Sequence, residues 1–197
     1  DVIAREDKIL KYLDIPLQHC NDKILKKMNR RGDKKYLCAL LDKLRERIPG
    51  LVLRTSIIAG LPGEGEEEFD ELCDFLREQK LLRAGVFPYS PEEGTRAAKM
   101  ERVDSDEAAR RAERIVDIQS EIIDAWNDER QGDVMEVLCE GFDGQSMLFV
   151  GRSYAESPDI DGRIYFSAPR DVAAGEFVPV RITGAMDGEL TGELAEE

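Results

Sequence analysis

The residues best suited to hold a small ligand lie between positions 51 and 64, where an apolar run ends in a glycine turn. The run 51–58 is rich in β-branched residues and predicts a buried strand. A turn containing Gly60, Pro62 and Gly63 follows it. The carboxylates of 64–68 then favour the start of a helix, because they interact well with the helix dipole. Strand, turn and helix start together predict a ligand at the carboxyl end of the strand. No Gly-Lys-Ser or Gly-Lys-Thr follows, so the turn is not a P-loop.

Polar side chains near this strand are candidates to contact that ligand. Gln18 ends an earlier apolar run (8–17), where its amide can bind a ribose or a carboxylate, or can hydrogen-bond a helix entry. His19, the single histidine, is either a donor near the ligand or a structural residue. Arg54 is a charge within an apolar strand and should meet a carboxylate, either the ligand's or an acidic side chain's. Ser56 shares its face, since residues i and i+2 of a strand point the same way.

Apolar residues and glycine complete the predicted site. Ile58 either packs on a ligand ring or belongs to the core, and Gly60 allows the backbone to approach a ligand closely. Phe87 and Tyr89 end a third predicted strand, 84–89, with core packing as the alternative for Phe87. The predicted ligand-binding residues are thus Gln18, His19, Arg54, Ser56, Ile58, Gly60, Phe87 and Tyr89.

The elements that position these residues alternate between strand and helix. Asn21-Asp22 and Asp33 are typical helix caps. A helical period runs to Ile48, and a further helix follows the glycine turn. Such alternation predicts parallel βα units, three of which form only part of a closed barrel. Ser90 to Val103 is predicted to be a loop, and Ser105-Asp106 to cap a long helix that ends near Arg130.

After Gly132 the apolar period changes to two, which predicts a second, all-β domain. Five short strands separated by glycine turns favour a small OB-like barrel. The expected domains are therefore 1–130 and 131–197. The five strands are expected near 134–140, 147–151, 163–166, 177–185 and 190–194.

Charge is distributed unevenly between these parts. The whole chain carries −14, and residues 131–197 hold 14 carboxylates against 4 arginines, which gives −10. A surface of that sign repels phosphates, so nucleic-acid binding is not expected. The acidic surface either attracts a basic partner or only keeps the protein in solution.

The cysteines and the hydropathy restrict the class of protein further. The four cysteines lie far apart without metal-ligand spacing, which predicts free thiols in a reducing cytoplasm and no metal site. No run of about 18 apolar residues is present, so no membrane span is expected. The chain starts without Met and without a visible signal peptide, which suggests a piece of a longer protein.

Four ordered motifs resemble the radical SAM methylthiotransferases. Residues 12–22 are similar to the family's fourth-strand region, 53–64 to its fifth strand with the glycine motif, and 87–95 to its sixth. The predicted β-barrel resembles the family's TRAM domain. Within it, residues 151–162 resemble the branch that modifies a ribosomal protein.

The resemblance implies a partial radical SAM barrel, its last three βα units, followed by a TRAM domain. It implies S-adenosylmethionine (SAM) as cofactor, bound by the eight residues above, with Ile58 on the adenine. It also implies two 4Fe-4S clusters in the complete enzyme. The implied reaction is methylthiolation of the β-carbon of an aspartate in small-subunit ribosomal protein twelve. The basic ribosomal protein is expected to contact Arg152, Tyr154, Glu156, Asp159 and Asp161.

This chain departs from the family pattern in one respect. The cluster-binding CxxxCxxC motif and the first three βα units are absent from it. It therefore resembles the carboxyl-terminal part of such an enzyme, and we expect it to be inactive alone, with no catalytic residue of its own.

Two other functions are open on the sequence. A methylthiotransferase acting on tRNA would usually have Ser-Gly in place of His19-Cys20, Arg in place of Glu92, and a basic TRAM domain. A non-enzymatic RNA-binding module is the other alternative. The acidic barrel counts against both of them.

Overall fold

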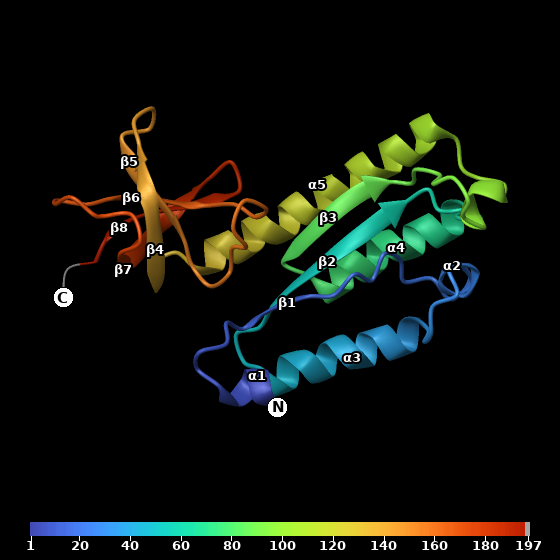
Figure 1. Cartoon of the computed structure of the whole chain (residues 1–197), viewed down its shortest axis with the longest axis horizontal. Coiled ribbons are helices and arrows are strands. Elements are labelled where there is room, and N and C mark those ends of the chain that lie inside the picture. Colours follow the sequence, from blue (N-terminus) through green and yellow to red (C-terminus); the bar gives the residue numbers. More distant parts are fainter. Residues whose placement is uncertain (196–197) are drawn as a thin grey trace. The chain divides into compact units, whose positions relative to one another are not determined.

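Three parallel strands form the first sheet in the computed structural model, which describes residues 1–195 (Figure 1). Their order is β1-β2-β3, with bounds Tyr12–Asp14, Val52–Ala59 and Arg83–Pro88. Pairing is parallel across both seams, as the strand and helix alternation predicts. The chain divides into two compact units, Asp1–Ile122 and Ile123–Glu197, and this sheet belongs to the first.

Helices alternate with these strands, and their capping residues explain where they begin. Asn21 Oδ1 accepts hydrogen bonds from the N–H groups of Lys23 and Ile24, and Asp33 caps the next helix, so both predicted caps are confirmed. The prediction that Ser105-Asp106 caps the long helix is wrong, because the side chain of Asp104 accepts from the Asp106 N–H. The helices are α1 Val2–Arg5, α2 Asp22–Lys27, α3 Lys34–Arg47, α4 Glu66–Gln79 and α5 Ser105–Glu129, with a 3₁₀ turn, η1 Ala97–Lys99, inside the predicted loop 90–103.

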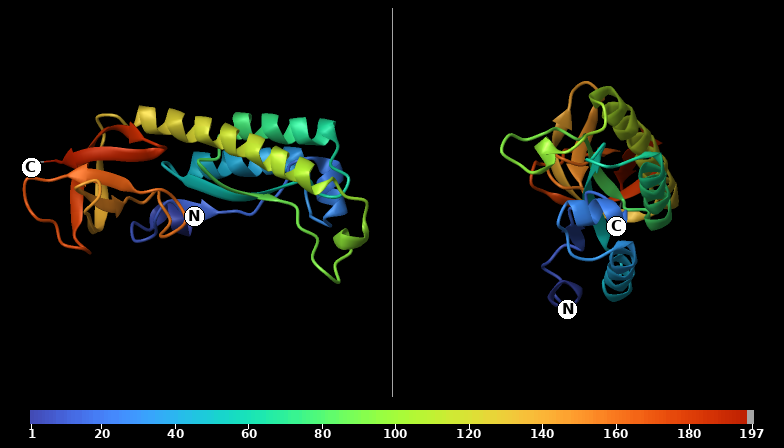
Figure 2. Two further views of the ribbon diagram at one scale, coloured as in Figure 1. Left: turned by 90° about the horizontal axis from the view of Figure 1, so that it is seen from above. Right: turned by 90° about the vertical axis from the view of Figure 1, so that its right-hand side faces the viewer.

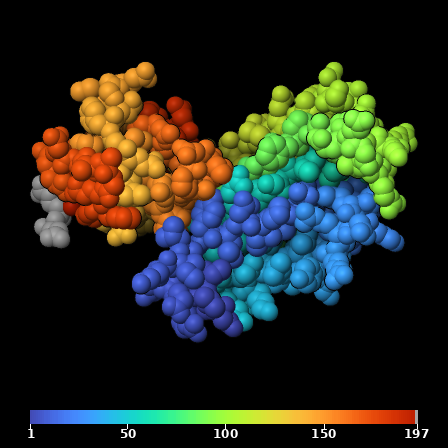
Figure 3. Space-filling model, viewed as in Figure 1, coloured from blue at the N-terminus to red at the C-terminus, as the bar shows by residue number. Residues whose placement is uncertain are grey.

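The two faces of β2 have different environments. Leu53, Ile57 and Ala59 point to a buried core that also contains side chains of α3, α4 and α5. Figure 2 shows α4 and α5 lying along this one face of the sheet. Arg54, Ser56 and Ile58 alternate with the core residues and lie half-buried on the other face, as their spacing predicts. Figure 3 shows a strip of teal atoms, the colour of residues near 55, at the surface between the blue amino-terminal residues and the green residues near 85.

The first strand is shorter than the predicted strand 8–17. Regular pairing stops at Asp14, shortly before Pro16, which has no N–H to donate to a ladder. The chain then rejoins β2 through an isolated bridge between Gln18 and Ile57. The prediction of one continuous strand over 8–17 is therefore wrong, since only Tyr12–Asp14 form the strand.

The second unit contains a closed five-stranded barrel in the order β4-β5-β6-β8-β7. All five predicted strands are present, and their ends differ from the predicted ends by at most three residues. Alternate side chains point inward, where Val137, Phe166 and Ile182 are almost fully buried. The strands are β4 Val134–Asp143, β5 Leu148–Arg152, β6 Ile164–Ser167, β7 Phe177–Met186 and β8 Glu189–Leu194. Within the described residues, no helix is long and apolar enough to cross a membrane.

Candidate functional site

A cavity of about 490 Å³ opens where β2 and β3 end, on the sheet face without helices. Five of the eight predicted ligand-binding residues line it: Gln18, Ser56, Ile58, Phe87 and Tyr89. The parallel register explains this grouping, because Ile58 lies opposite Phe87 and Ser56 opposite Gly85. The remaining lining residues are Pro88, Ser90, Glu92, Thr95 and Ala97.

Gln18 enters this cavity from an unusual backbone conformation. Its φ is +66°, a left-handed value that few non-glycine residues adopt. Two backbone hydrogen bonds to β2 hold it there: its N–H donates to Ser56 O, and its O accepts from the Ile58 N–H. Its side-chain Oε1 accepts from Arg30 Nη2 at 2.8 Å. Both the backbone and the amide of Gln18 are therefore fixed.

Tyr89 contributes a hydroxyl that has no partner. The Tyr89 N–H donates to Ala59 O at 2.8 Å, which fixes the end of β3 against β2. The hydroxyl oxygen is buried, yet no hydrogen-bond partner for it lies within residues 1–195. A buried hydroxyl normally has a partner, so this one indicates a ligand or a water in the cavity. Phe87 beside it remains about half exposed (52%).

His19, Arg54 and Gly60 do not line the cavity. His19 is fully buried; its Nδ1 accepts from the Asn21 N–H, and its Nε2 lies 3.4 Å from Glu64 Oε2. Arg54 donates from Nη1 to Asp14 Oδ2 at 2.6 Å, so its carboxylate partner here is a side chain. Gly60, at φ +81°, leaves space for Ala108, since an added Cβ would come within 2.5 Å of that methyl group.

Glu64 organises the glycine turn from inside the protein. Its Oε1 accepts from the Gly60 N–H at 2.9 Å and from Arg111 Nη1 at 2.9 Å, and its Oε2 lies 3.4 Å from the Leu61 nitrogen that donates to it. Burial alone would raise the pKa of Glu64, but the nearby His19 ring and the hydrogen bonds from Gly60 and Arg111 outweigh it and hold the pKa below its usual value. The Glu64 carboxylate therefore fixes the turn through hydrogen bonds to its backbone.

The predicted substrate-binding residues belong to the barrel. Arg152 pairs with Glu140 at 2.9 Å, and Tyr154 packs half-buried against the barrel core. Glu156 is buried, and its carboxylate accepts from the N–H and the hydroxyl of Ser153. The expectation that Glu156 belongs to an exposed acidic surface is therefore wrong, because the carboxylate is used inside the loop. Asp159 is exposed, and Asp161 accepts from the Ser157 N–H at 2.8 Å.

Comparison with known proteins gives two domain matches and a set of similar enzymes. Residues 1–76 match the Radical SAM superfamily, and residues 132–195 match the TRAM domain. Over 196 residues the chain is 43% identical to ribosomal protein uS12 methylthiotransferase RimO of Acetivibrio thermocellus, and over 195 residues it is 47% identical to the RimO of Pelotomaculum thermopropionicum. These alignments cover 99% and 98% of this chain. The chain thus holds a radical SAM segment and a TRAM domain, and over nearly its whole length it is similar to these methylthiotransferases.

The chain spans less than half the length of these relatives, 43% and 44% respectively. The RimO of Symbiobacterium thermophilum gives the same result, at 45% identity with 41% of its length covered. Among solved structures, coproporphyrinogen III oxidase (HemN) from Escherichia coli, a radical SAM enzyme, matches 57% of this chain and 27% of its own. The TM-score is 0.49 and the identity 21%, a likeness too weak to decide the fold.

The four cysteines of this chain lie apart from one another as free thiols. Cys20, Cys73 and Cys139 are buried as free thiols, and Cys38 is half-buried. Burial is the main cause that raises the pKa of all four thiols, which disfavours the thiolate that a cluster needs. In the described part of the chain no group of three or more His, Cys, Asp or Glu side chains is placed to hold a metal ion. The residues present do not fit an iron–sulfur cluster.

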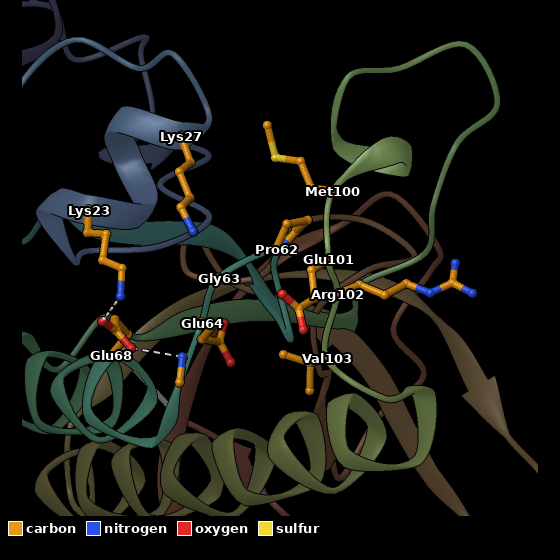
Figure 4. A pocket seen from close by; sticks show the side chains of 11 residues that line it. Lys23, Lys27, Pro62, Gly63, Glu64, Glu68, Met100, Glu101, Arg102 and Val103 are labelled. Atoms are coloured by element: carbon orange, nitrogen blue, oxygen red, sulfur yellow. Dashed lines mark hydrogen bonds and ion pairs between the residues drawn. The ribbon is translucent and has the colours of Figure 1, made fainter.

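A second cavity, of about 560 Å³, lies beside the glycine turn that follows β2. It is lined by residues of α2, this turn, the start of α4 and the loop before α5. Figure 4 shows Lys23 joined to Glu68, and Lys27 directed at Gly63, while Arg102 points away. The hydrogen bond from Lys23 is the main cause that lowers the pKa of Glu68, to about 2. Lys23 is therefore engaged by a carboxylate of the protein itself.

Several residues at the two sites were not predicted from the sequence. Arg30 and Arg111 hold Gln18 and Glu64, but they lie 12 and 47 positions away along the chain. Glu92 and Thr95 line the cavity from the loop after β3. Motif spacing cannot predict which residues these two arginines contact, because the contacts form only when α2 and α5 pack against the sheet.

Proposed function

We propose that this chain supplies the SAM-binding side of a radical SAM methylthiotransferase that modifies ribosomal protein uS12 at an aspartate β-carbon. The observation that carries the proposal is the grouping of Gln18, Ser56, Ile58, Phe87 and Tyr89 around one cavity. The relatives named above act, by name, on ribosomal protein uS12. A cytoplasmic location fits a ribosomal protein substrate.

The cavity fits SAM in its chemistry. Ile58 and Phe87 offer apolar surface for an adenine ring, while Ser56 and the unpartnered Tyr89 hydroxyl offer hydrogen bonds to its polar edges or to the ribose. SAM held by these residues would supply radical chemistry toward an unactivated carbon of the substrate. The residues of this chain orient the nucleoside and exclude water from it.

Arg54, His19 and Gly60 act on this site indirectly in our proposal. Arg54 lies two residues before Ser56 on the same face of β2, paired with Asp14, so its charge reaches the cavity without lining it. His19 and Gly60 meet at Glu64 and keep the turn in place. The ion pair makes a direct bond from Arg54 to SAM less favourable than the sequence indicates.

The three parallel strands are best understood as the last part of a (βα) barrel. The open face of the sheet carries the candidate site, and a closed barrel would turn that face inward. We propose domains of 1–130 and 131–197 for this arrangement. The two 4Fe-4S clusters would be bound by cysteines outside this chain.

The barrel is the proposed docking module for the basic ribosomal protein. Residues 131–197 carry −10, and Asp159 and Asp171 are exposed. Opposite charge accelerates the encounter of two proteins more than it adds affinity. Arg152 and Tyr154 would contribute to this surface, whereas Glu156 and Asp161 shape the loop that carries it. Nucleic acid is not a proposed partner.

Titration of SAM into the purified chain, followed by ligand-detected NMR, tests the SAM site. We expect Tyr89→Phe to weaken binding by about three- to tenfold, the range for one hydrogen bond. Tyr165→Phe is a matched control, since Tyr165 lies on β6 of the barrel. Equal affinity in wild type and Tyr89→Phe would contradict a role for this hydroxyl, and absence of SAM binding in wild type would contradict the SAM site.

A further inference from the structure

The least expected contact near the cavity joins Gln18 to Arg30, an exposed arginine just after α2. Arg30 Nη2 donates to Gln18 Oε1 at 2.8 Å, and Arg30 Nη1 donates to Pro16 O, also at 2.8 Å. One guanidinium thus holds both the segment that leads into Gln18 and the tip of its side chain. A planar, two-pronged donor is suited to bind two acceptors at once.

This contact decides which end of the Gln18 amide faces the ligand. Arginine has only donors, so it can meet only the oxygen of a carboxamide. The amide nitrogen of Gln18 is then left for the cavity, and the described part of the chain offers no acceptor to it. The cavity therefore presents an N–H donor, which recognises an acceptor on the ligand.

The backbone of Gln18 supports a functional interpretation of the contact. A left-handed conformation at a non-glycine residue is a strain that persists only where the surroundings impose it, and such residues are frequent at binding sites. Here the surroundings are the two hydrogen bonds to β2 and the arginine at the side-chain tip. Backbone and side chain are constrained independently toward the same cavity.

We propose that Arg30 is a positioning residue that orients the Gln18 amide so that its NH₂ group donates to the carboxylate of SAM. The proposal rests on the proposed function in one respect, the identity of the ligand. Arg30 does not line the cavity; it acts on the position of Gln18, through the Gln18 side chain and through the backbone at Pro16 that leads to it.

A double-mutant cycle on SAM affinity tests this role. We expect Arg30→Ala to weaken SAM binding about three- to tenfold and Arg30→Lys to restore part of the loss, because an ammonium group cannot reproduce the planar fork. In the Gln18→Ala background, Arg30→Ala should have no further effect. Additive losses would show that Arg30 contacts SAM directly, and would overturn the proposal.

Two further variants separate orientation from folding and from charge. Gln18→Glu keeps an oxygen for Arg30 but turns an acceptor toward the cavity, so it should weaken SAM binding at least as much as Gln18→Ala does. Arg31→Ala removes the same charge from the neighbouring exposed residue and should leave SAM affinity unchanged. Tighter SAM binding by Gln18→Glu would overturn the assigned amide orientation.

The ligand-free protein distinguishes failure of this inference from failure of the proposed function. In a ¹H–¹⁵N spectrum without SAM, Arg30→Ala should shift the side-chain amide signals of Gln18, whereas Arg31→Ala should not. SAM binding that is unaffected by Arg30→Ala overturns the inference alone. Wild type that binds no SAM overturns the proposed function, even where the amide signals respond to Arg30→Ala.

Discussion

Glu64 in the first unit and Glu156 in the barrel are both buried glutamates that hold a loop, with 3% and 5% of their surfaces exposed. Glu156 accepts hydrogen bonds from Ser153, three residues before it. Glu64 instead joins segments far apart in sequence, because His19, the glycine turn and Arg111 all meet at its carboxylate. The first glutamate fixes tertiary structure, and the second fixes one local turn.

Glu64 and Glu156 show two ways in which a buried glutamate can stabilise a loop without contacting a ligand. Removing a local cap leaves the rest of a barrel in place, whereas removing a shared carboxylate leaves a buried arginine with fewer partners. Arg111 would keep Glu107 at 2.9 Å and the more exposed Glu66 at 3.4 Å. We therefore expect loss of Glu64 to destabilise the first compact unit strongly, and loss of Glu156 to destabilise the barrel less.

The largest effect is expected for Glu64→Ala. Breaking one partner of a buried ion pair costs about 3–5 kcal/mol, and we expect the first unit to lose that much stability. Urea unfolding followed by far-ultraviolet circular dichroism measures it. The single tryptophan, Trp126, packs on the barrel core, so its fluorescence reports the second unit separately.

Glu67→Ala is the control for this variant, since Glu67 is an exposed glutamate in the first turn of α4, three residues after Glu64. Its unfolding midpoint should stay at the wild-type value. A Glu64→Ala protein as stable as Glu67→Ala would mean that the buried network contributes nothing to the fold.

A smaller effect is expected for Glu156→Ala. It leaves the Ser153 N–H and hydroxyl without their acceptor in a buried loop, at a cost of about 1–3 kcal/mol. The loss should appear in the Trp126 fluorescence transition. A loss equal to that of Glu64→Ala would break the distinction between the local and the tertiary glutamate.

Acid should weaken the contribution of Glu64 to stability, with a smaller effect than its replacement by alanine. The pKa of Glu64 is lowered in the folded state, so its contribution is fully present above the ordinary value of 4.5 and is lost as pH falls through the lower folded pKa. We expect wild-type stability to fall in that window, and Glu64→Gln to lose part of this pH dependence. Identical pH profiles of the two proteins, measured by urea unfolding, would contradict the network.

The smallest effect per residue is expected on the exposed barrel surface. Asp159→Lys with Asp171→Lys should slow association with ribosomal protein uS12, and the slowing should shrink as salt shortens the Debye length to about 8 Å at 0.15 M. Each exposed charge is worth only about 0–1 kcal/mol of affinity. Stopped-flow association over a salt series measures the rate. Unchanged rates at every salt concentration, or a wild-type preference for tRNA, would contradict the docking role.

The sequence predicts the parts of this structure that depend on local spacing. The shared face of Arg54, Ser56 and Ile58 follows from strand alternation, and the caps at Asn21 and Asp33 follow from residue type. The partners of Glu64 and Gln18 could not be predicted, because Arg111 and Arg30 reach them only after α5 and α2 have packed. Glu156 was misjudged for a similar reason, since acidic composition alone does not distinguish a surface carboxylate from one that accepts hydrogen bonds inside its own loop.

The order of strands in the barrel has a consequence for how the protein is made. β8, the last strand in the described chain, sits between β6 and β7, and its pairing with β6 is parallel. During synthesis, β6 and β7 emerge from the ribosome before β8, the strand that joins them. Each then carries an unpaired edge, and exposed edges of this kind invite pairing with other chains. The barrel is thus most vulnerable to aggregation in the interval before β8 has emerged and paired with β6 and β7.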